Sequence, residues 1–400
     1  MNRKKINYLV KWTMIALLLA VICGSVIAIY LQCINKGEGI RKHHLWIVFF
    51  LPFVGAFCTY LYERFQLIRA VGNDWLIAAA KGKDEQVSLV GVPVSMFGTI
   101  ASQLFGASMG REDIATHIAG TLSLHVSSRL KLNRQDRRIV IMAAMASGFG
   151  ATFGTPIAGS LFAMEVLKER TIQLYAVFPV FITSFFTTIV TRLFGISYHY
   201  YHLTEVPTLN FSFMLFLLIS CVIFGLCGKI YHSSIQYLSQ KLLQLLKHRV
   251  LVTFIGGVIV VSLVFLFHKT AFLGLSSQMQ KEALTGSLTA DSFLWKGLLT
   301  IISIATGFRG GSMTPIFDIG SSLGFTLGEI SQQNAHFIAS LGFIGVFSAA
   351  TNTPLTCFIL GIELFGSDGA LYYFMVALFS FLFSSSFSLF KNQTLESDML

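Results

Sequence analysis

The sequence predicts an all-α polytopic membrane protein built from broken and tilted helices. Of its 400 residues, 54% are hydrophobic and only 12% are charged, which is about half the charged share of a soluble domain. The apolar stretches are continuous, whereas membrane barrels alternate apolar and polar residues, so the spans are predicted to be helices. Several are shorter than the roughly 20 residues that a straight span needs. Others contain Gly or Pro, which favours interrupted helices.

The apolar segments follow one another along most of the chain. They lie near residues 13–31, 44–62, 87–109, 114–128, 139–164, 172–195, 211–227, 250–267, 293–306, 313–328, 337–350 and 355–388. The first has a basic start but no small-residue cleavage signal, so we expect an uncleaved helix. A short polar tail follows Phe390, and no soluble regulatory domain is expected. The six cysteines form no Cys-x-x-Cys pair, so we interpret them as packing residues, with no metal site.

The net charge of +10 lies mainly in short segments between the apolar runs and near the start of the chain. No aromatic-basic platform accompanies it, so nucleic acid is not an expected partner. Basic loops are typical of proteins in the cell membrane, where lipid surrounds the chain. Lys and Arg occur in loops expected on both faces, so they do not set the orientation.

One charged segment interrupts the apolar region. Arg111, Glu112 and Asp113 stand between the uncharged run 87–110 and the nearly uncharged run 114–128. Charged groups at membrane depth are costly and usually face an ion or proton path. Gly106 and Gly110 allow a backbone break, and a helix that starts there points free N–H groups and its positive dipole end at an anion. The segment therefore predicts an anion site with a carboxylate beside it.

The chain also contains an internal duplication. Residues Ala151–Glu165 resemble Ala349–Glu363, with Pro156 and Pro354 lying 198 residues apart and a glutamate nine positions after each. Gly-rich breaks upstream, at 110–120 and 310–320, are offset by 200. We therefore predict one transmembrane domain over residues 1–400, with repeat one at about 45–200 and repeat two at about 205–390. Broken helices from two halves that meet near the midplane are how transporters build ion sites.

At these motifs the chain resembles the CLC family of chloride channels and proton-coupled anion exchangers. Gly110-Arg-Glu112 is similar to the family's Gly-Arg/Lys-Glu-Gly-Pro segment, and Gly310–Pro315 to its Gly-Gly-x-Phe-x-Pro segment. Ala151–Glu165 resembles the helix that starts Asn-Ala-Pro-Leu-Ala-Gly, and Ala349–Glu363 resembles its second-half counterpart. Four motifs in the family's order cover nearly the whole membrane region, about residues 45–390.

The fluoride-exporting branch resembles this chain most closely. Val71-Gly-Asn73-Asp74 precedes Val92-Pro-Val-Ser-Met96, then Phe105–Glu112 follows, and Thr314 stands before Pro315 as in that branch. The resemblance implies inverted halves, a homodimer, Glu112 as gate and proton-coupling residue, and chloride or fluoride with protons as transported ions. The resemblance and the positions of the chain breaks together predict the anion-binding residues, which are Asn73, Gly110, Arg111, Ser312, Met313 and Phe390.

The chain departs from the family at several positions. Asp113 replaces a glycine, Asp74 replaces a neutral amide, Phe390 stands where a tyrosine hydroxyl usually binds the central anion, and Val166 replaces the internal glutamate of chloride exchangers. Two classes of function follow: halide transport, as a channel or an anion/proton antiporter, and a degenerate non-transporting paralogue that acts as a scaffold or partner subunit. No nucleotide site, cofactor site or nucleophile–base pair is visible, so an enzyme is not expected.

Three local expectations complete the picture. Asp113 is expected to cap its own helix and to turn away from the anion path, since its carboxylate can accept first-turn N–H groups. His117 is expected to bond a neighbouring carbonyl rather than to relay protons. Glu165 and Glu363 are expected to be solvated at the ends of their helices.

Overall fold

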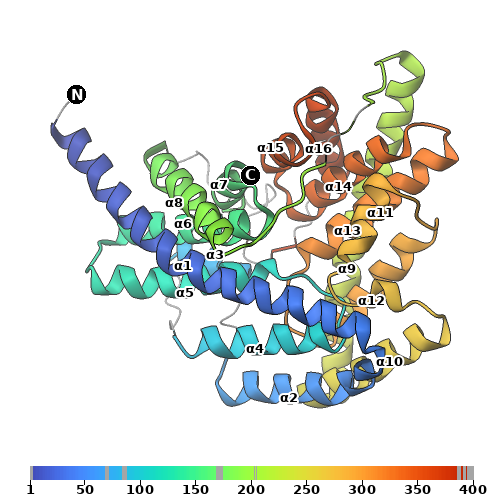
Figure 1. The fold of residues 1–400 in the computed structure, drawn as a ribbon, viewed down its shortest axis with the longest axis horizontal. Coiled ribbons are helices and arrows are strands. Elements are labelled where there is room, and N and C mark those ends of the chain that lie inside the picture. Colours follow the sequence, from blue (N-terminus) through green and yellow to red (C-terminus); the bar gives the residue numbers. More distant parts are fainter. Residues whose placement is uncertain are drawn as a thin grey trace.

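The computed structural model describes residues 3–67, 72–82, 88–167, 174–201, 203, 205–384, 389, 390 and 393. Within these residues the secondary structure is helical, and the first and second halves of the chain lie largely on opposite sides of the molecule (Figure 1). The helices are α1 (Arg3–His43), η1 (Leu45–Phe50), α2 (Leu51–Arg64), α3 (Asn73–Ala80), α4 (Gly91–Leu104), α5 (Glu112–Arg129), α6 (Arg134–Phe153), α7 (Pro156–Glu165), α8 (Leu174–Leu193), α9 (Phe211–Leu246), α10 (Arg249–Leu266), η2 (Thr270–Phe272), α11 (Ser277–Thr285), α12 (Ser292–Ala305), α13 (Met313–Ile330), α14 (Ala335–Thr351), α15 (Pro354–Phe365) and α16 (Ala370–Ser384).

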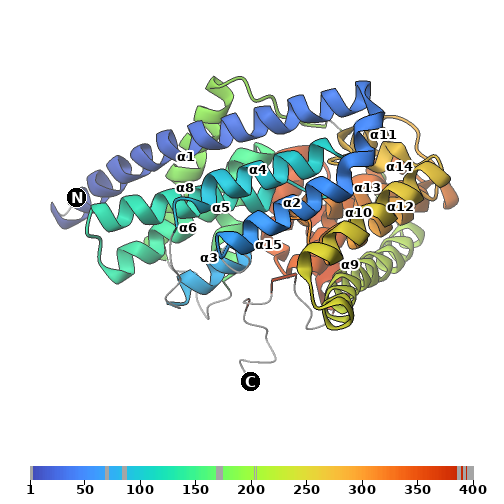
Figure 2. The same ribbon diagram turned by 90° about the horizontal axis from the view of Figure 1, so that it is seen from below.

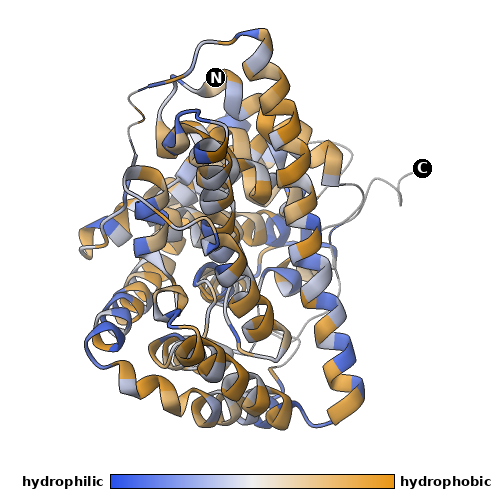
Figure 3. Cartoon of the chain, turned by 90° about the vertical axis from the view of Figure 1, so that its right-hand side faces the viewer, coloured by the Kyte–Doolittle hydropathy of each residue, from blue (hydrophilic) through white to orange (hydrophobic). Residues whose placement is uncertain are grey.

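Helix lengths fit a membrane domain of tilted spans. Among the described residues, five helical stretches are long and apolar enough to cross a bilayer. The 41 residues of α1 correspond to roughly 60 Å at 1.5 Å per residue, about twice the hydrocarbon thickness. This helix runs diagonally to α4 and α5 in Figure 1 and lies along one side of the first half in Figure 2. Hydrophobic residues run along the outer helices, while hydrophilic ones gather mostly near helix ends and loops (Figure 3).

The two Thr-Pro motifs divide apolar runs into pairs of helices. The helix α6 is followed by Gly154, with φ of 77°, and α14 is followed by Asn352, with φ of 55°. Gly and Asn accept this left-handed conformation more readily than other residues. Proline then starts α7 and α15, where its missing N–H costs nothing. The predicted broken helices are therefore present in both halves.

The same succession of helices occurs in each half. The helices α4 and α12 start 201 residues apart (91 and 292), as do α5 and α13 (112 and 313) and α6 and α14 (134 and 335). The 20 residues of α6 become 17 in α14, which reduces the offset to 198 at the prolines. Gly110 therefore corresponds to Gly311, one position beyond the Gly310 suggested by the motif alignment.

The helices α7 and α15 cap each other. Glu363, at the end of α15, accepts the N–H groups of Ile157 and Ala158 at 3.0 and 2.7 Å. Glu165, at the end of α7, accepts those of Leu355 and Thr356 at 2.9 and 2.7 Å. The two helices thus run antiparallel, with a carboxylate at each positive dipole end. The expectation that these glutamates are simply solvated is wrong, because helix N-termini lie within reach of both.

Candidate anion site

The Gly-rich breaks of the two halves meet in a short antiparallel bridge. Gly110 N–H donates to the Gly311 carbonyl at 2.6 Å, and Gly311 N–H donates to the Gly110 carbonyl at 2.9 Å. The Gln103 side-chain amide donates to the Met109 and Gly110 carbonyls at 3.0 and 2.9 Å. The bridge brings the starts of α5 and α13 together, although they are 201 residues apart in sequence.

Glu112 lies against this bridge and is fully buried. One carboxylate oxygen accepts the Met313 N–H at 2.6 Å, and the other accepts the Thr314 hydroxyl at 2.6 Å. A Cβ at Gly311 would lie 1.9 Å from Glu112 Oε1, so this close approach requires glycine. The first residue of α5 is thus bound by the N-terminal turn of α13, where the dipole favours a negative charge.

Two cavities lie beside this contact. The first, of about 280 Å³, is lined by residues that include Asn73, Asp113, Arg249, Arg309, Gly310, Ser312 and Phe390. The second, of about 480 Å³, is lined by residues that include Asn35, Glu38, Arg111, Tyr198, Thr314 and Phe317. Ser312 faces the first cavity and Thr314 the second, while Met313 between them binds Glu112. The neighbours of Glu112 in sequence likewise line different cavities, Asp113 the first and Arg111 the second, so the enclosed carboxylate lies between the two.

The first cavity holds charges of both signs. Arg249 and Arg309 line it, and neither guanidinium forms an ion pair or donates a hydrogen bond to another described residue; Arg309 lies over the Tyr62 ring, 5.7 Å from its centroid. Asp74 and Asp113 line the same space. The two guanidiniums give this cavity positive charge, since Arg stays charged at all physiological pH values.

Asn73 and Asp113 contact each other. The Asn73 side-chain N–H donates to a carboxylate oxygen of Asp113. Asp113 therefore binds the first residue of α3, and it lines the first cavity with Asn73. The expectation that it caps its own helix and turns from the cavity is wrong, because the side chain of Asn73 is the donor that its carboxylate meets. The side-chain amide oxygen of Asn73 is buried without a hydrogen-bond partner among the described residues.

Three other predicted anion-binding residues, Gly110, Arg111 and Phe390, lie in different surroundings. The Gly110 N–H is engaged by Gly311, so the prediction that it is free for an anion does not hold in this conformation. The Arg111 guanidinium donates to Asn35 at 2.9 Å in the second cavity rather than to an anion position near Glu112. Phe390 lines the first cavity and packs edge-on against Phe162, with 5.9 Å between centroids. It offers the positive edge of a ring but no hydroxyl.

His117 lies outside both cavities. It packs edge-on against Trp75 at 5.4 Å between centroids and lies close to the Gly91 backbone. Its ring nitrogens are buried, and Nε2 lies beside the Gly91 backbone, so the expected bond to a carbonyl stays a prediction.

Sequence reasoning missed several residues of this region. Gln103 holds the bridge, Arg249 and Arg309 line the first cavity, and Lys296 and Asp318 form a buried ion pair behind it. Lys296 and Asp318 stand alone in the apolar runs 293–306 and 313–328. The rule that singles out Glu112, a charge at membrane depth, applies equally to both of them.

Comparisons with known proteins agree with this geometry. A sequence model of the family described as "Voltage gated chloride channel" matches residues 54–385. A protein of Pseudomonas syringae pv. tomato, named "Chloride/fluoride channel protein", is 29% identical over 392 residues, which cover 96% of this chain and 87% of the relative.

Solved structures share the fold. The crystal structure of a CLC-type fluoride/proton antiporter superposes with a TM-score of 0.92 at 26% identity, covering 98% of this chain and 99% of that one. The structure of a slow cyanobacterial Cl⁻/H⁺ antiporter gives a TM-score of 0.82 at 19% identity over 93% of this chain and 94% of that one, which shows a shared fold. The chain is thus a multi-pass membrane protein of all-α CLC architecture, and it belongs to the voltage gated chloride channel family.

Proposed function

We propose that this chain exchanges fluoride for protons across the membrane, with the Glu112 carboxylate as the group that both ions use. The observation that carries the proposal is the pair of 2.6 Å bonds from Met313 N–H and the Thr314 hydroxyl to Glu112. A buried N–H at a helix start and a hydroxyl are donors suited to a small anion. The carboxylate therefore occupies a position that a transported anion would take.

Protonation of Glu112 opens this position. An ionised carboxylate keeps strong charge-assisted bonds to Met313 and Thr314 and repels an incoming anion. A protonated carboxyl is neutral, so these bonds weaken and an anion can take its place. Because Glu112 lies between the two cavities, a carboxyl that gains its proton from one cavity and loses it to the other moves a proton against the anion.

Fluoride is the proposed anion because the site offers compact donors and the chain is similar to proteins named for fluoride. Fluoride is small and strongly hydrated, so dense N–H and O–H donors must replace its water. Asn73 supplies an amide group to the first cavity, and Thr314 supplies a hydroxyl beside Glu112. The relative from Pseudomonas and the antiporter structure both carry fluoride in their names.

The proposed assembly is a homodimer within lipid. The helices α7 and α15 present Ile157 and Leu355, 46% and 48% exposed, at matching second positions. A second copy packed on this antiparallel pair would bury both side chains. The size of the purified protein in detergent, measured by light scattering, should be that of two chains; a single chain would contradict this assembly.

Flux from liposomes tests the proposed function. Purified protein should move fluoride faster than chloride, and a fluoride gradient should drive protons in the opposite direction. Asn73→Ser should lower the ratio of fluoride to chloride flux, because it removes an amide from the first cavity. Fluoride movement without proton movement would indicate a channel, and flux no higher than in empty liposomes would contradict transport altogether.

A further inference from the structure

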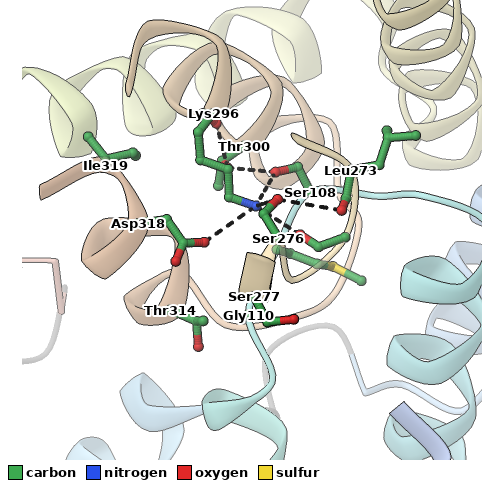
Figure 4. Close-up of polar contacts among 12 residues, drawn as sticks. Ser108, Gly110, Leu273, Ser276, Ser277, Lys296, Thr300, Thr314, Asp318 and Ile319 are labelled. Atoms are coloured by element: carbon green, nitrogen blue, oxygen red, sulfur yellow. Dashed lines mark hydrogen bonds and ion pairs between the residues drawn. The ribbon is translucent and has the colours of Figure 1, made fainter. Parts of the chain in front are cut away.

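Lys296 and Asp318 form an ion pair that is completely enclosed. Their side chains are 0% and 1% exposed, and Lys296 Nζ lies 3.7 Å from Asp318 Oδ2. The ammonium donates to Ser108 Oγ at 3.0 Å, to the Gly274 carbonyl at 2.8 Å and to Ser276 Oγ at 2.9 Å (Figure 4). Since an ammonium has three N–H groups, all of its donors are used by groups other than Asp318.

The Asp318 carboxylate is consequently short of donors. Both oxygens are buried and neither has a hydrogen-bond partner among the described residues. A carboxylate in such a place is neutralised by Lys296 but lacks the hydrogen bonds that offset its loss of water. A proton on one of its oxygens, or a water molecule that brings one, meets this need. The geometry is thus that of a proton acceptor rather than of a complete structural salt bridge.

The position of Asp318 relates it to Glu112. Asp318 follows Thr314 by four residues on α13, so the two side chains share one face of the helix, with Cβ atoms roughly 6 Å apart. Thr314 donates its hydroxyl to Glu112 at 2.6 Å. Figure 4 shows Asp318 projecting from α13 toward Lys296, one turn beyond Thr314. The Thr314 hydroxyl thus bonds Glu112 and belongs to the helix face that carries Asp318.

Titratable groups of several helices interact electrostatically with Asp318. Lys296 of α12, Glu38 of α1 and Glu112 of α5 act on its charge, and the charge of Asp318 acts on Tyr231 of α9 and on Tyr201. Lys296 also ties Ser108, two residues before the Gly110 bridge, to the second half of the chain. A change in the charge of Lys296 or Asp318 would therefore act on the backbone that leads into α5.

We propose that Asp318 is an internal proton-binding residue that exchanges protons with Glu112, while Lys296 holds the counter-charge. In the transfer, the O–H bond of protonated Asp318 breaks and its proton passes to a water molecule between the two side chains, that water gives a proton to the Thr314 oxygen, and the hydroxyl proton of Thr314 forms the new O–H bond on Glu112. The summed charge of the two carboxyl groups stays at −1, and Lys296 keeps its proton. The assignment rests on the proposed fluoride/proton exchange and adds a residue to its proton route.

Asp318→Asn tests this role because it keeps the shape and cannot carry the exchanging proton. In liposomes, protons moved per fluoride should fall tenfold or more relative to the native chain. Asp318→Glu, which restores a carboxyl, should recover part of the ratio. Ser322→Ala is the matched control: this buried hydroxyl donates only to α13 carbonyls, including that of Asp318 at 2.8 Å, and its removal should leave the ratio native.

A second variant separates proton transfer from folding. If Asp318→Asn leaves Lys296 too unstable in the interior, Lys296→Gln/Asp318→Asn gives a neutral pair and should show the same loss of coupling. Either variant combined with Glu112→Gln should conduct fluoride like Glu112→Gln alone, which shows an intact anion path. A native proton-to-fluoride ratio in Asp318→Asn or in the double variant would overturn the proposal.

Infrared titration gives a reading that does not depend on transport. The native protein should show a carboxyl band that is lost in Asp318→Asn and shifts in Glu112→Gln, since the two groups exchange a proton. If the native chain moves fluoride without protons, the proposed function fails, yet this band still decides whether Asp318 binds a proton. An unchanged carboxyl spectrum in Asp318→Asn would overturn the inference by itself.

Discussion

Glu112 is held by hydrogen-bond donors from the second half of the chain. In the proposed exchange, these are the donors that an anion would use. The neighbours of Glu112, Met313 N–H and the Thr314 hydroxyl, are fixed at the start of a helix. Fixed donors keep their geometry when the carboxylate leaves, so they remain available to an anion. In the proposed exchange, control of the site therefore depends on one side chain that changes its charge.

The variant Glu112→Gln should uncouple the transporter. The amide has the size of the protonated carboxyl but cannot release a proton, so proton movement driven by fluoride should fall at least tenfold while fluoride leak persists. The measurement is paired proton and fluoride flux from liposomes. Glu63→Gln, an exposed carboxyl on α2, is the control and should behave like the native protein. Unchanged coupling in Glu112→Gln would remove this residue from the mechanism.

The variant Asp113→Asn should raise fluoride flux. Asp113 lines the first cavity and takes up the N–H of Asn73, so its negative charge opposes anions at that point. Loss of the charge should increase flux per folded protein about tenfold, which corresponds to about 1.4 kcal/mol of barrier. A change of less than threefold would show that the charge of Asp113 does not reach the anion path.

At this scale the sequence identifies residues that break an obvious pattern. Glu112 was predictable because it follows a long uncharged run and a Gly-rich break. The partner of Asp113 was not, since the start of α3 lies 40 residues away in sequence. Lys296 and Asp318 were visible as isolated charges, but only the packing of α12 on α13 reveals that they pair.

At the scale of helices, the reciprocal caps of α7 and α15 join the halves. Each glutamate accepts two backbone N–H groups of the other helix, so the pair satisfies donors that a membrane would leave unmet. The helices have only 10 and 12 residues and cannot span a bilayer alone. Their stability therefore depends on these caps and on neighbouring helices.

We expect Glu165→Gln and Glu363→Gln each to destabilise the fold by about 1–3 kcal/mol, because each weakens hydrogen bonds to a charged acceptor. Thermal unfolding in detergent, followed by tryptophan fluorescence, measures the effect. Glu329→Gln removes an exposed carboxylate near the end of α13 and should change little. Unfolding temperatures equal to that of the control would show that the caps contribute nothing.

The helix boundaries show where sequence patterns suffice. Gly and Pro located the breaks at residues 154–156 and 352–354, since both residues restrict the backbone locally. The helices α3 and α11 were not predicted, because they have 8 and 9 residues and stand outside long apolar runs. The polar end of α1, beyond residue 31, was also missed; packing of Glu38 and Arg41 in the interior keeps it helical.

At the scale of the whole molecule, the repeated helices predict inverted halves. Lys131 and Gln332 are exposed residues in left-handed conformation, and both occupy the turn that follows the first helix of the site in their half. A two-fold axis in the membrane plane would put them on opposite faces of the bilayer. The internal repeat was predictable from motifs, whereas its offset of 201 depended on helix lengths.

Lys131→Cys and Gln332→Cys should react with a membrane-impermeant thiol reagent from opposite sides of sealed vesicles. The native chain, with its six mostly buried cysteines, serves as the background control. Labelling of both positions from the same side would mean that the axis lies along the membrane normal, and the inverted arrangement would be wrong.

The glycine bridge has a consequence for how one chain makes an asymmetric site. Gly110 pairs with its own counterpart, Gly311, as residues do in an isologous dimer interface on its axis. By the same offset, Met313 is the counterpart of Glu112, and Thr314 is the counterpart of Asp113. Two identical subunits would bring two carboxylates to one place, where they repel. Duplication within a single gene lets one copy keep the acid while the other supplies its donors.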